Sequence, residues 1–268
     1  MSKTITFPTC RDPFYITVNG KLQVFPGGAT VEVDDSVAEI IQNHIDLQPK
    51  KDPNAGKEQG GGSSKLASLV ERSVCELTED DMKGAAYIGA YAFERCLALT
   101  KVTIPDNITK IENNAFSYCE TLESVSFSNS ITSIGMYAFN NCPKLKSAIL
   151  PNNLPSIAQS VFMQCSELES VTIPDSVQTI GQSSFYGCNL KSVIIPKDVI
   201  IIGRSAFYNC TRLKSVTVRA STPPVIDTNV FNYVPDDCIF TVPVGSGEAY
   251  RTATNWSERA DYIVEGDV

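Results

Sequence analysis

Apolar side chains recur along the chain from about residue 93 with a period close to 23 residues. Phenylalanines mark the period at Phe93, Phe116, Phe139, Phe162, Phe185, Phe207 and Phe231. Cysteines follow three positions later at Cys96, Cys119, Cys142, Cys165, Cys188 and Cys210. Five full units result, covering residues 99–121, 122–144, 145–167, 168–189 and 190–212. A period of this size indicates stacked repeats rather than an ordinary globular core.

Each unit follows the pattern L-x-x-V-x-I-P-x-x-V-x-x-I-G-x-x-A-F-x-x-C and has three parts. Leu168, Val171 and Ile173 are typical of a short strand with one buried face, and Pro174 ends it. The segment 177–181 buries two more apolar residues before a glycine that we expect to permit a sharp turn. The last segment, such as 206–210, places apolar residues at i, i+1 and i+4, which predicts one helical or 3₁₀ turn.

One unit alone cannot cover its apolar residues, so the units must stack with strand on strand in parallel. The fourth unit lacks one residue before Leu190, yet the phase of the pattern continues beyond it. The fold class predicted is therefore mainly β with short helical turns, arranged as a solenoid of 23-residue units.

With its A-F-x-x-C segment, this unit resembles the repeat of the BspA-like leucine-rich repeat family, over about residues 66–263. The C-terminal segments 222–224, 238–243, 245–250 and 255–256 look like that family's C-terminal cap. The resemblance implies a right-handed leucine-rich-repeat solenoid, used mostly on cell surfaces by adhesins and binders of host proteins. It implies no catalytic residue.

Residues 14–47 predict a small β-β-β-α module. Strands at 14–18 and 21–25 flank Asn19-Gly20, a strong hairpin signal, and a third strand is expected at 30–33. Ser36 and Glu39 form a capping box for a helix that ends near Leu47. A unit this small rarely folds alone, so we expect it to associate with the solenoid, a capsid or tail, or copies of itself.

The remaining segments complete the predicted domain organisation: a tail at 1–13, a flexible Gly- and Pro-rich linker at 48–64, an N-terminal cap with a partial repeat at 65–98, and a partial repeat with a C-terminal cap at 213–268. Within the small module, the segments V-N-G-K (18–21) and V-E-V-D-D-S-V-A-E-I (31–40) resemble small N-terminal modules of gut-phage virion proteins. That resemblance implies presentation on a virion.

Composition excludes several classes of function. The chain has 22 basic and 30 acidic side chains, a formal charge of -8, and no basic stripe, so we expect no nucleic-acid binding. A single histidine, His44, leaves little room for acid-base catalysis, and we expect no enzyme activity, cofactor or metal site. The start of the chain lacks the apolar run of a signal peptide, and the longest apolar run, 199–202, is too short for membrane insertion.

The six repeat cysteines should form one column with neighbours about 4.8 Å apart. Equivalent stacked side chains point the same way, whereas a disulfide needs converging bonds. We therefore expect buried, reduced thiols. A column of thiolates holding a soft metal is the alternative, although C-x-x-C spacing and nearby histidines are missing.

Two outward columns should border the first strand of each unit. Glu123, Lys146, Glu169 and Lys191 alternate in sign, which predicts attraction between adjacent units. The second column contains two isoleucines, Ile149 and Ile194, that could contribute to strand stability or to a binding surface.

Tyrosines and further isoleucines complete the candidate binding surface. Tyrosine is favoured at interaction hot spots, and these rings should face outward on the turn side, although ordinary partial burial is the alternative. The candidates are Tyr118, Tyr137, Tyr186, Tyr208, Ile149, Ile194, Ile200 and Ile201. Ile200 and Ile201 would form a small apolar patch on the fifth unit.

The sequence therefore predicts a non-enzymatic recognition protein that presents its solenoid to a cell-surface protein or glycan. Two locations agree with this hypothesis, a virion surface and a bacterial cell surface. The alternative to a recognition protein is a purely structural spacer or oligomerisation protein, which would bind no ligand.

Overall fold

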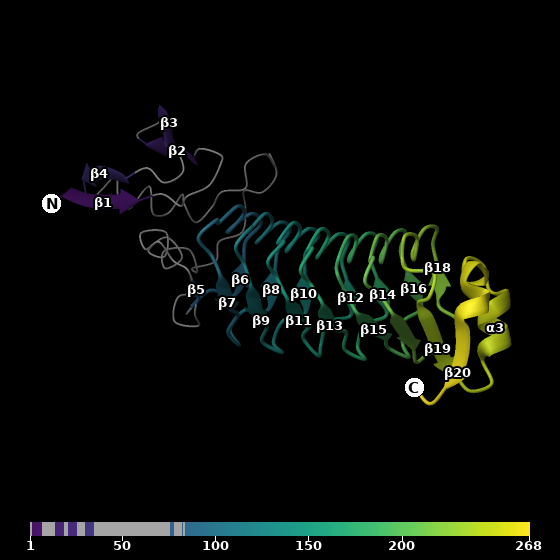
Figure 1. The fold of residues 1–268 in the computed structure, drawn as a ribbon. Coiled ribbons are helices and arrows are strands. Elements are labelled where there is room, and N and C mark those ends of the chain that lie inside the picture. The colour runs from purple at the N-terminus through teal and green to yellow at the C-terminus, as the bar shows by residue number, and fades with distance from the viewer. Residues whose placement is uncertain are drawn as a thin grey trace.

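The fold is an elongated stack of chain turns, followed in Figure 1 from teal to yellow. The structure is a computed structural model. It describes the backbone of residues 2–6, 14–18, 21–25, 30–34, 76–77 and 82 and of residues 84–268. Side chains are described for residue 82 and from residue 84 onward.

The first strand of each repeat lies along one side of the stack and pairs in parallel with its neighbours, as in the register of Val102 with Val125. Hydrogen bonding groups these strands as β5-β7-β9, β11-β13 and β15-β17-β19-β20. Their bounds are β5 (Glu76–Leu77), β7 (Lys101–Thr103), β9 (Ser124–Ser126), β11 (Ser147–Ile149), β13 (Ser170–Thr172), β15 (Ser192–Ile195), β17 (Ser215–Val218), β19 (Ile239–Pro243) and β20 (Ile263–Gly266). We call this side the first sheet face.

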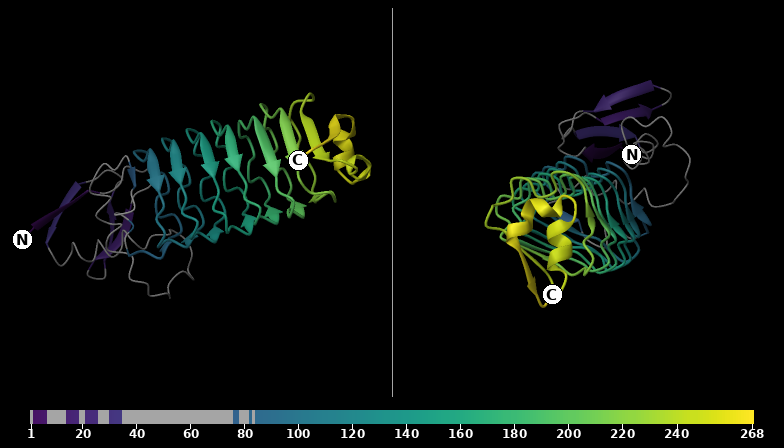
Figure 2. Two further views of the ribbon diagram at one scale, coloured as in Figure 1. Left: turned by 90° about the horizontal axis from the view of Figure 1, so that it is seen from below. Right: turned by 90° about the vertical axis from the view of Figure 1, so that its right-hand side faces the viewer.

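A second row of parallel strands, each of two residues, occupies another side of the stack (Figure 2). The middle segment of the repeat forms these strands, which the sequence analysis did not predict. They pair as β6-β8-β10 and β12-β14-β16-β18, and we call this side the second sheet face. Their bounds are β6 (Tyr87–Ile88), β8 (Lys110–Ile111), β10 (Ser133–Ile134), β12 (Ser156–Ile157), β14 (Thr179–Ile180), β16 (Ile201–Ile202) and β18 (Val225–Ile226).

The A-F-x-x-C segment contains the i+3→i hydrogen bond of a single 3₁₀-type turn, such as Cys165 N–H to the carbonyl of Phe162 at 3.2 Å, but it does not form a continuous helix. Each segment contains two residues in the left-handed region four positions apart, such as Tyr137 at φ 59° and Asn141 at φ 56°. Such residues interrupt a right-handed helix. The backbone N–H of Phe139 instead donates to the carbonyl of Val161 in the next repeat, at 2.9 Å. The turn side is thus a third hydrogen-bonded ladder between repeats.

The repeat glycine has a steric role rather than the expected conformational one. The φ angle of Gly181 is not positive, so any residue could adopt its backbone conformation. A Cβ atom at Gly181 would lie 2.7 Å from the carbonyl oxygen of Ile157 in the previous repeat. Glycine is therefore favoured here because two turns of backbone approach closely.

The core is built from columns of equivalent side chains. Rings of Phe93, Phe116, Phe139, Phe162, Phe185, Phe207 and Phe231 stack with centroids 5.1 to 5.7 Å apart and planes 6° to 12° apart. These phenylalanines and the strand leucines, valines and isoleucines are buried. The repeat therefore has a continuous apolar interior, as its 23-residue pattern predicted.

The last turn of the solenoid is closed by α3 (Gly247–Thr252), the 3₁₀ helix η2 (Trp256–Tyr262) and β20 (Figure 2). The hydroxyl of Tyr250 donates to the carbonyl of Ala220 at 2.6 Å, and the indole N–H of Trp256 donates to the carbonyl of Pro224 at 2.8 Å. The Trp256 ring also packs on Phe231, with centroids 5.7 Å apart. The end of the core is thereby covered and its backbone carbonyls have donors.

Near the N-terminus, β2 (Phe14–Val18) and β3 (Lys21–Phe25) pair as an antiparallel hairpin, as predicted. The third predicted strand is also present as β4 (Thr30–Asp34). It pairs antiparallel with β1 (Ser2–Thr6), so part of the segment predicted as a tail is a strand. The predicted helix at 36–47 and the linker at 48–64 lie outside the described residues.

Candidate binding surface

The repeat cysteines are packing residues with a hydrogen-bonding function. The side chains of Cys119, Cys142, Cys165, Cys188 and Cys210 are fully buried and their thiols are free. Each donates to the carbonyl oxygen of the phenylalanine in the preceding repeat, as Cys142 does to Phe116 at 3.2 Å. The column was predicted from the sequence, whereas these hydrogen bonds were not.

Burial also makes these thiols chemically inert. It raises the pKa of Cys119, Cys142 and Cys188 well above the ordinary value, because a thiolate would have to be desolvated. The thiolate is the nucleophile and the metal-binding form of cysteine. Within the described residues, no group of three or more Cys, His, Asp or Glu side chains could hold a metal ion.

Charged side chains on the first sheet face form pairs rather than a continuous ladder. Lys146 Nζ lies 3.3 Å from Glu123, and Lys191 Nζ lies 2.5 Å from Glu169, which also contacts Arg212 at 3.4 Å. The hydrogen bond from Lys191 lowers the pKa of Glu169. Because all these side chains are exposed, the pairs contribute little to stability.

The first sheet face carries isolated apolar residues. Ile149 is 71% exposed and Ile194 is also exposed, but each pairs with a threonine of the next repeat, Thr172 and Thr217 respectively. The two isoleucines are thus separated along the column. The structure does not gather them into one apolar surface.

The second sheet face does contain a contiguous apolar surface at its C-terminal end. Ile200 is 58% exposed, Ile201 is 45% exposed and Val225 is 70% exposed. Ile201 and Val225 are direct partners in the parallel register of β16 and β18. We call these three residues the apolar patch. Ile200 and Ile201 were predicted, and Val225 was missed because the canonical repeat ends before it.

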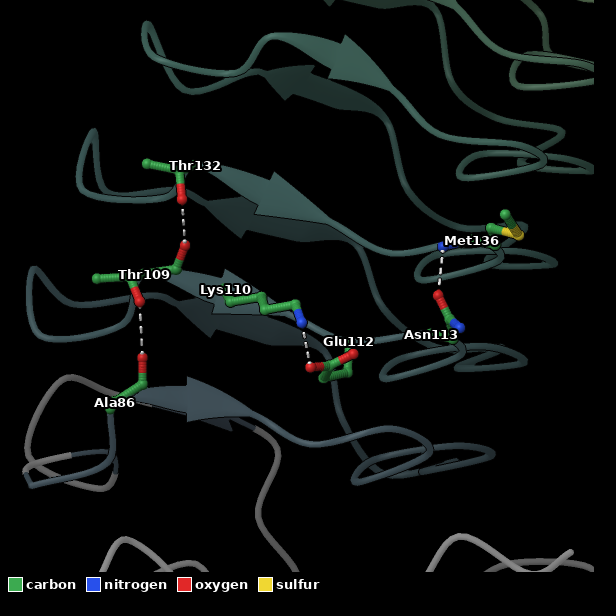
Figure 3. Close-up of polar contacts among 7 residues, drawn as sticks. All are labelled: Ala86, Thr109, Lys110, Glu112, Asn113, Thr132 and Met136. Carbon is green, nitrogen blue, oxygen red and sulfur yellow. Dashed lines mark hydrogen bonds and ion pairs between the residues drawn. The ribbon is translucent and has the colours of Figure 1, made fainter. Parts of the chain in front are cut away.

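Two earlier repeats carry polar side chains at the same positions (Figure 3). Thr109 and Thr132 stand in earlier repeats where Ile200 stands, and their hydroxyls donate to carbonyl oxygens one repeat back, at 3.2 and 3.3 Å. Lys110, which corresponds to Ile201, forms an ion pair with Glu112 at 2.7 Å. The apolar patch therefore departs from these two repeats, although Tyr87 and Pro155 show that the positions are not polar in every repeat.

The four predicted tyrosines are half-buried and fall into separate groups. The guanidinium of Arg95 lies 5.2 Å from the ring centre of Tyr118, and the hydroxyl of Tyr137 accepts a hydrogen bond from Gln159 at 2.9 Å. Tyr186 and Tyr208 stack on each other in the last repeats, with ring centroids 4.9 Å apart.

Tyr233, which was not predicted from the sequence, extends the second tyrosine group. Its ring lies 5.0 Å from that of Tyr208, centroid to centroid, and the residue is 67% exposed. It follows Phe231 by two positions, so the phenylalanine column could have placed it on the turn side. The candidate surface thus concentrates at the C-terminal end of the solenoid.

A parallel stack of short strands around a continuous apolar core, with one turn per repeat, defines a leucine-rich-repeat solenoid. Residues 86–214 match the model for the BspA type leucine rich repeat region in six copies. This region of the chain belongs to that family, which confirms the resemblance predicted from the sequence.

A solved structure of a leucine rich repeat protein agrees with this fold. The leucine rich repeat protein of T. pallidum, TpLRR, is 25% identical and superposes with a TM-score of 0.56, over 63% of this chain and 82% of that one. A leucine rich cell surface protein from Faecalibacterium prausnitzii is 24% identical, with a TM-score of 0.43, over 60% of this chain and 59% of that one. No curated protein gives a significant match.

The family and the fold are typical of binding proteins without catalytic activity. No helix among the described residues is long and apolar enough to cross a membrane. The resemblance of the N-terminal module to phage virion proteins stays a prediction.

Proposed function

We propose that this protein is a non-enzymatic recognition protein that binds a cell-surface protein or glycan through the C-terminal part of its solenoid. The observation that carries the proposal is the apolar patch of Ile200, Ile201 and Val225, three adjacent exposed aliphatic side chains at the C-terminal end of the second sheet face. A contiguous apolar surface on a soluble scaffold is typical of an interaction site.

The scaffold supports this function because its surface is ordered before a ligand arrives. Adjacent repeats are hydrogen-bonded on both sheet faces and on the turn side, except between β10 and β12 on the second sheet face, and the C-terminal elements hold the last turn in place. A rigid surface loses little conformational entropy on binding, so more of the contact energy appears as affinity. Membership of a family of binding and adhesion proteins points the same way.

The same proposal places the protein on a surface, either of a virion or of a bacterial cell. Proteins with BspA-like repeats are cell-surface proteins, which supports the second location. The segment 14–47 would then anchor the solenoid, by docking on a capsid or tail or by self-association. Fractionation of particles, envelopes and cytosol, followed by immunodetection, would separate these locations, and a purely cytosolic monomer would contradict both.

A cell-binding assay with the full chain tests the binding site. The double substitution Ile201→Ser and Val225→Ser should reduce retention on target cells by about tenfold or more, because it removes two adjacent exposed apolar side chains. Ile149→Ser is the control, since Ile149 is at least as exposed as either substituted residue but isolated. Equal retention of both variants would contradict the proposed site. No retention of the unsubstituted protein, with a stable trimer by light scattering, would favour a structural spacer.

A further inference from the structure

Three tyrosines form a continuous row on the turn side of the last repeats. The rings of Tyr186 and Tyr208 are parallel within 7°, and the ring of Tyr233 is turned by 64° relative to Tyr208. The neighbouring Tyr233 side chain raises the pKa of Tyr208. We call this row the tyrosine ridge. Tyr233 is the most exposed aromatic residue of the described chain, so part of the ridge remains open to a ligand.

The turn segments that form and flank the tyrosine ridge are nearly free of charge. The four neighbouring turn segments are 159–164, 182–187, 204–209 and 228–233, and Arg204 is their only charged residue. Amide side chains are frequent instead, at Gln159, Gln164, Gln182, Asn209, Asn229 and Asn232. Gln164, Gln182 and Asn209 are exposed. This surface offers hydrogen-bond donors and acceptors without a net electrostatic preference.

The C-terminal end of the ridge meets a small polar depression. Asn232 takes the position of Tyr208 one repeat later, and it lines this depression together with Asn229 and Asn255. Asp227, Glu258 and Arg259 also line it, so both signs of charge are present there. The Nδ2 group of Asn232 donates to Oδ1 of Asn229 at 3.0 Å. Within the described residues, Oδ1 of Asn232 and Nδ2 of Asn229 have no protein partner. These two groups are therefore free to bind a polar ligand.

We infer that the tyrosine ridge binds an uncharged oligosaccharide. A pyranose ring has an apolar C–H face bordered by hydroxyl groups, and this combination fits an exposed tyrosine ring beside amide side chains. A charged glycan would need countercharges, which these segments lack apart from Arg204. A protein partner would favour an apolar interface core. The exposed aliphatic residues of that kind lie instead on the second sheet face, in the apolar patch.

This inference rests on the proposed recognition function and names a ligand class for a separate part of the surface. An array of neutral, sialylated and sulfated oligosaccharides, probed with the full chain, tests it. We expect retention by at least one neutral oligosaccharide and a loss of about tenfold in affinity for Tyr233→Ala, which is about 1.4 kcal/mol. Tyr208→Phe keeps the ring but removes a hydroxyl, so its loss should be smaller.

Tyr87→Ala is the matched control, because Tyr87 is an exposed tyrosine on the second sheet face at the other end of the solenoid. Its affinity should equal that of the unsubstituted protein, and thermal unfolding should show that all variants are folded. Binding of acidic glycans only, or equal binding by Tyr233→Ala, would overturn the inference. If no glycan binds while cells are still retained through the apolar patch, this inference fails and the proposed function stands. If the protein binds neither glycans nor cells, both this inference and the proposed function fail.

Discussion

The thiol of Cys165 donates a hydrogen bond to the carbonyl oxygen of Phe139, 3.1 Å away and 26 residues earlier in the chain. The same contact recurs between Cys188 and Phe162. A buried carbonyl that lacked this donor would lose a hydrogen bond. The cysteine column therefore connects adjacent repeats as well as filling the core, which explains why a small residue with a donor group occupies this position.

The cysteine column should make the solenoid sensitive to alkaline pH. Burial raises the pKa of Cys210 from an ordinary value of 9.0 to about 12. The unfolded thiol ionises first, so its contribution to stability is complete below pH 9 and decreases as pH rises toward 12, by up to about 1.4 kcal/mol per pH unit. Urea unfolding at pH 8 and pH 10.5 measures this decrease. It should be smaller for Cys210→Ala, and an equal decrease in both proteins would exclude the thiol as its cause.

The close approach of backbones predicts a strong effect of Gly181→Ala. The new Cβ atom would lie 2.7 Å from backbone atoms that cannot move without disturbing the previous repeat. We expect a loss of about 1–3 kcal/mol in the free energy of unfolding. Gly89→Ala is the control. Gly89 has the same position in the repeat, but a Cβ atom added there would have no other heavy atom within 4 Å. Similar unfolding midpoints for the two variants would contradict the steric explanation.

The C-terminal elements should be held by the hydroxyl of Tyr250. Tyr250→Phe removes its hydrogen bond and leaves the buried carbonyl of Ala220 without that donor, a loss of about 1–3 kcal/mol. Because solenoid repeats contact only their neighbours, the opening should be local. Hydrogen exchange should accelerate in β19 and β20 but not in β9. Tyr87→Phe should leave exchange in β19 and β20 unchanged, and unchanged exchange in Tyr250→Phe would contradict this prediction.

The phenylalanine column should transmit cooperativity between the two ends of the solenoid. Phe162 stacks on Phe139 and Phe185, and Phe162→Ala would leave a cavity in the middle repeat that costs about 3–5 kcal/mol. Unfolding should then become broader or separate into two transitions, because the repeats on either side lose contact. Calorimetry measures this. Ile149→Ala, at an exposed position, should retain a single transition near the original midpoint.

The solenoid could be predicted because its buried side chains repeat without interruption. Because the phenylalanines and the cysteines each recur once per repeat, stacking of the repeats places each residue type in one buried column. The strands of the second sheet face were missed because two residues, such as Thr179 and Ile180, are too few to show strand alternation. The turn conformation was missed because Tyr137 and Asn141 occupy left-handed positions without the glycine that usually signals them.

The candidate surface was only partly predictable for a different reason. Val225 and Tyr233 follow the last regular unit, where the pattern used to align positions is incomplete. Val225 lies 24 residues after Ile201 and is its partner in the parallel register of the last repeats. Tyr233 lies 25 residues after Tyr208, one position beyond the equivalent residue, and its ring still contacts that of Tyr208. Exposed residues carry no periodic signal of their own, so the structure was needed to distinguish isolated isoleucines from the apolar patch.

The C-terminal closure has a consequence for how such a protein can change its dimensions. α3, η2 and β20 contact only the end of the stack, so a unit gained or lost upstream by recombination would leave the ridge and the patch intact. Each such event would move them by about 4.8 Å along the axis. The length of the solenoid could thus change by one repeat at a time during evolution, while the binding surface at its C-terminal end stays the same.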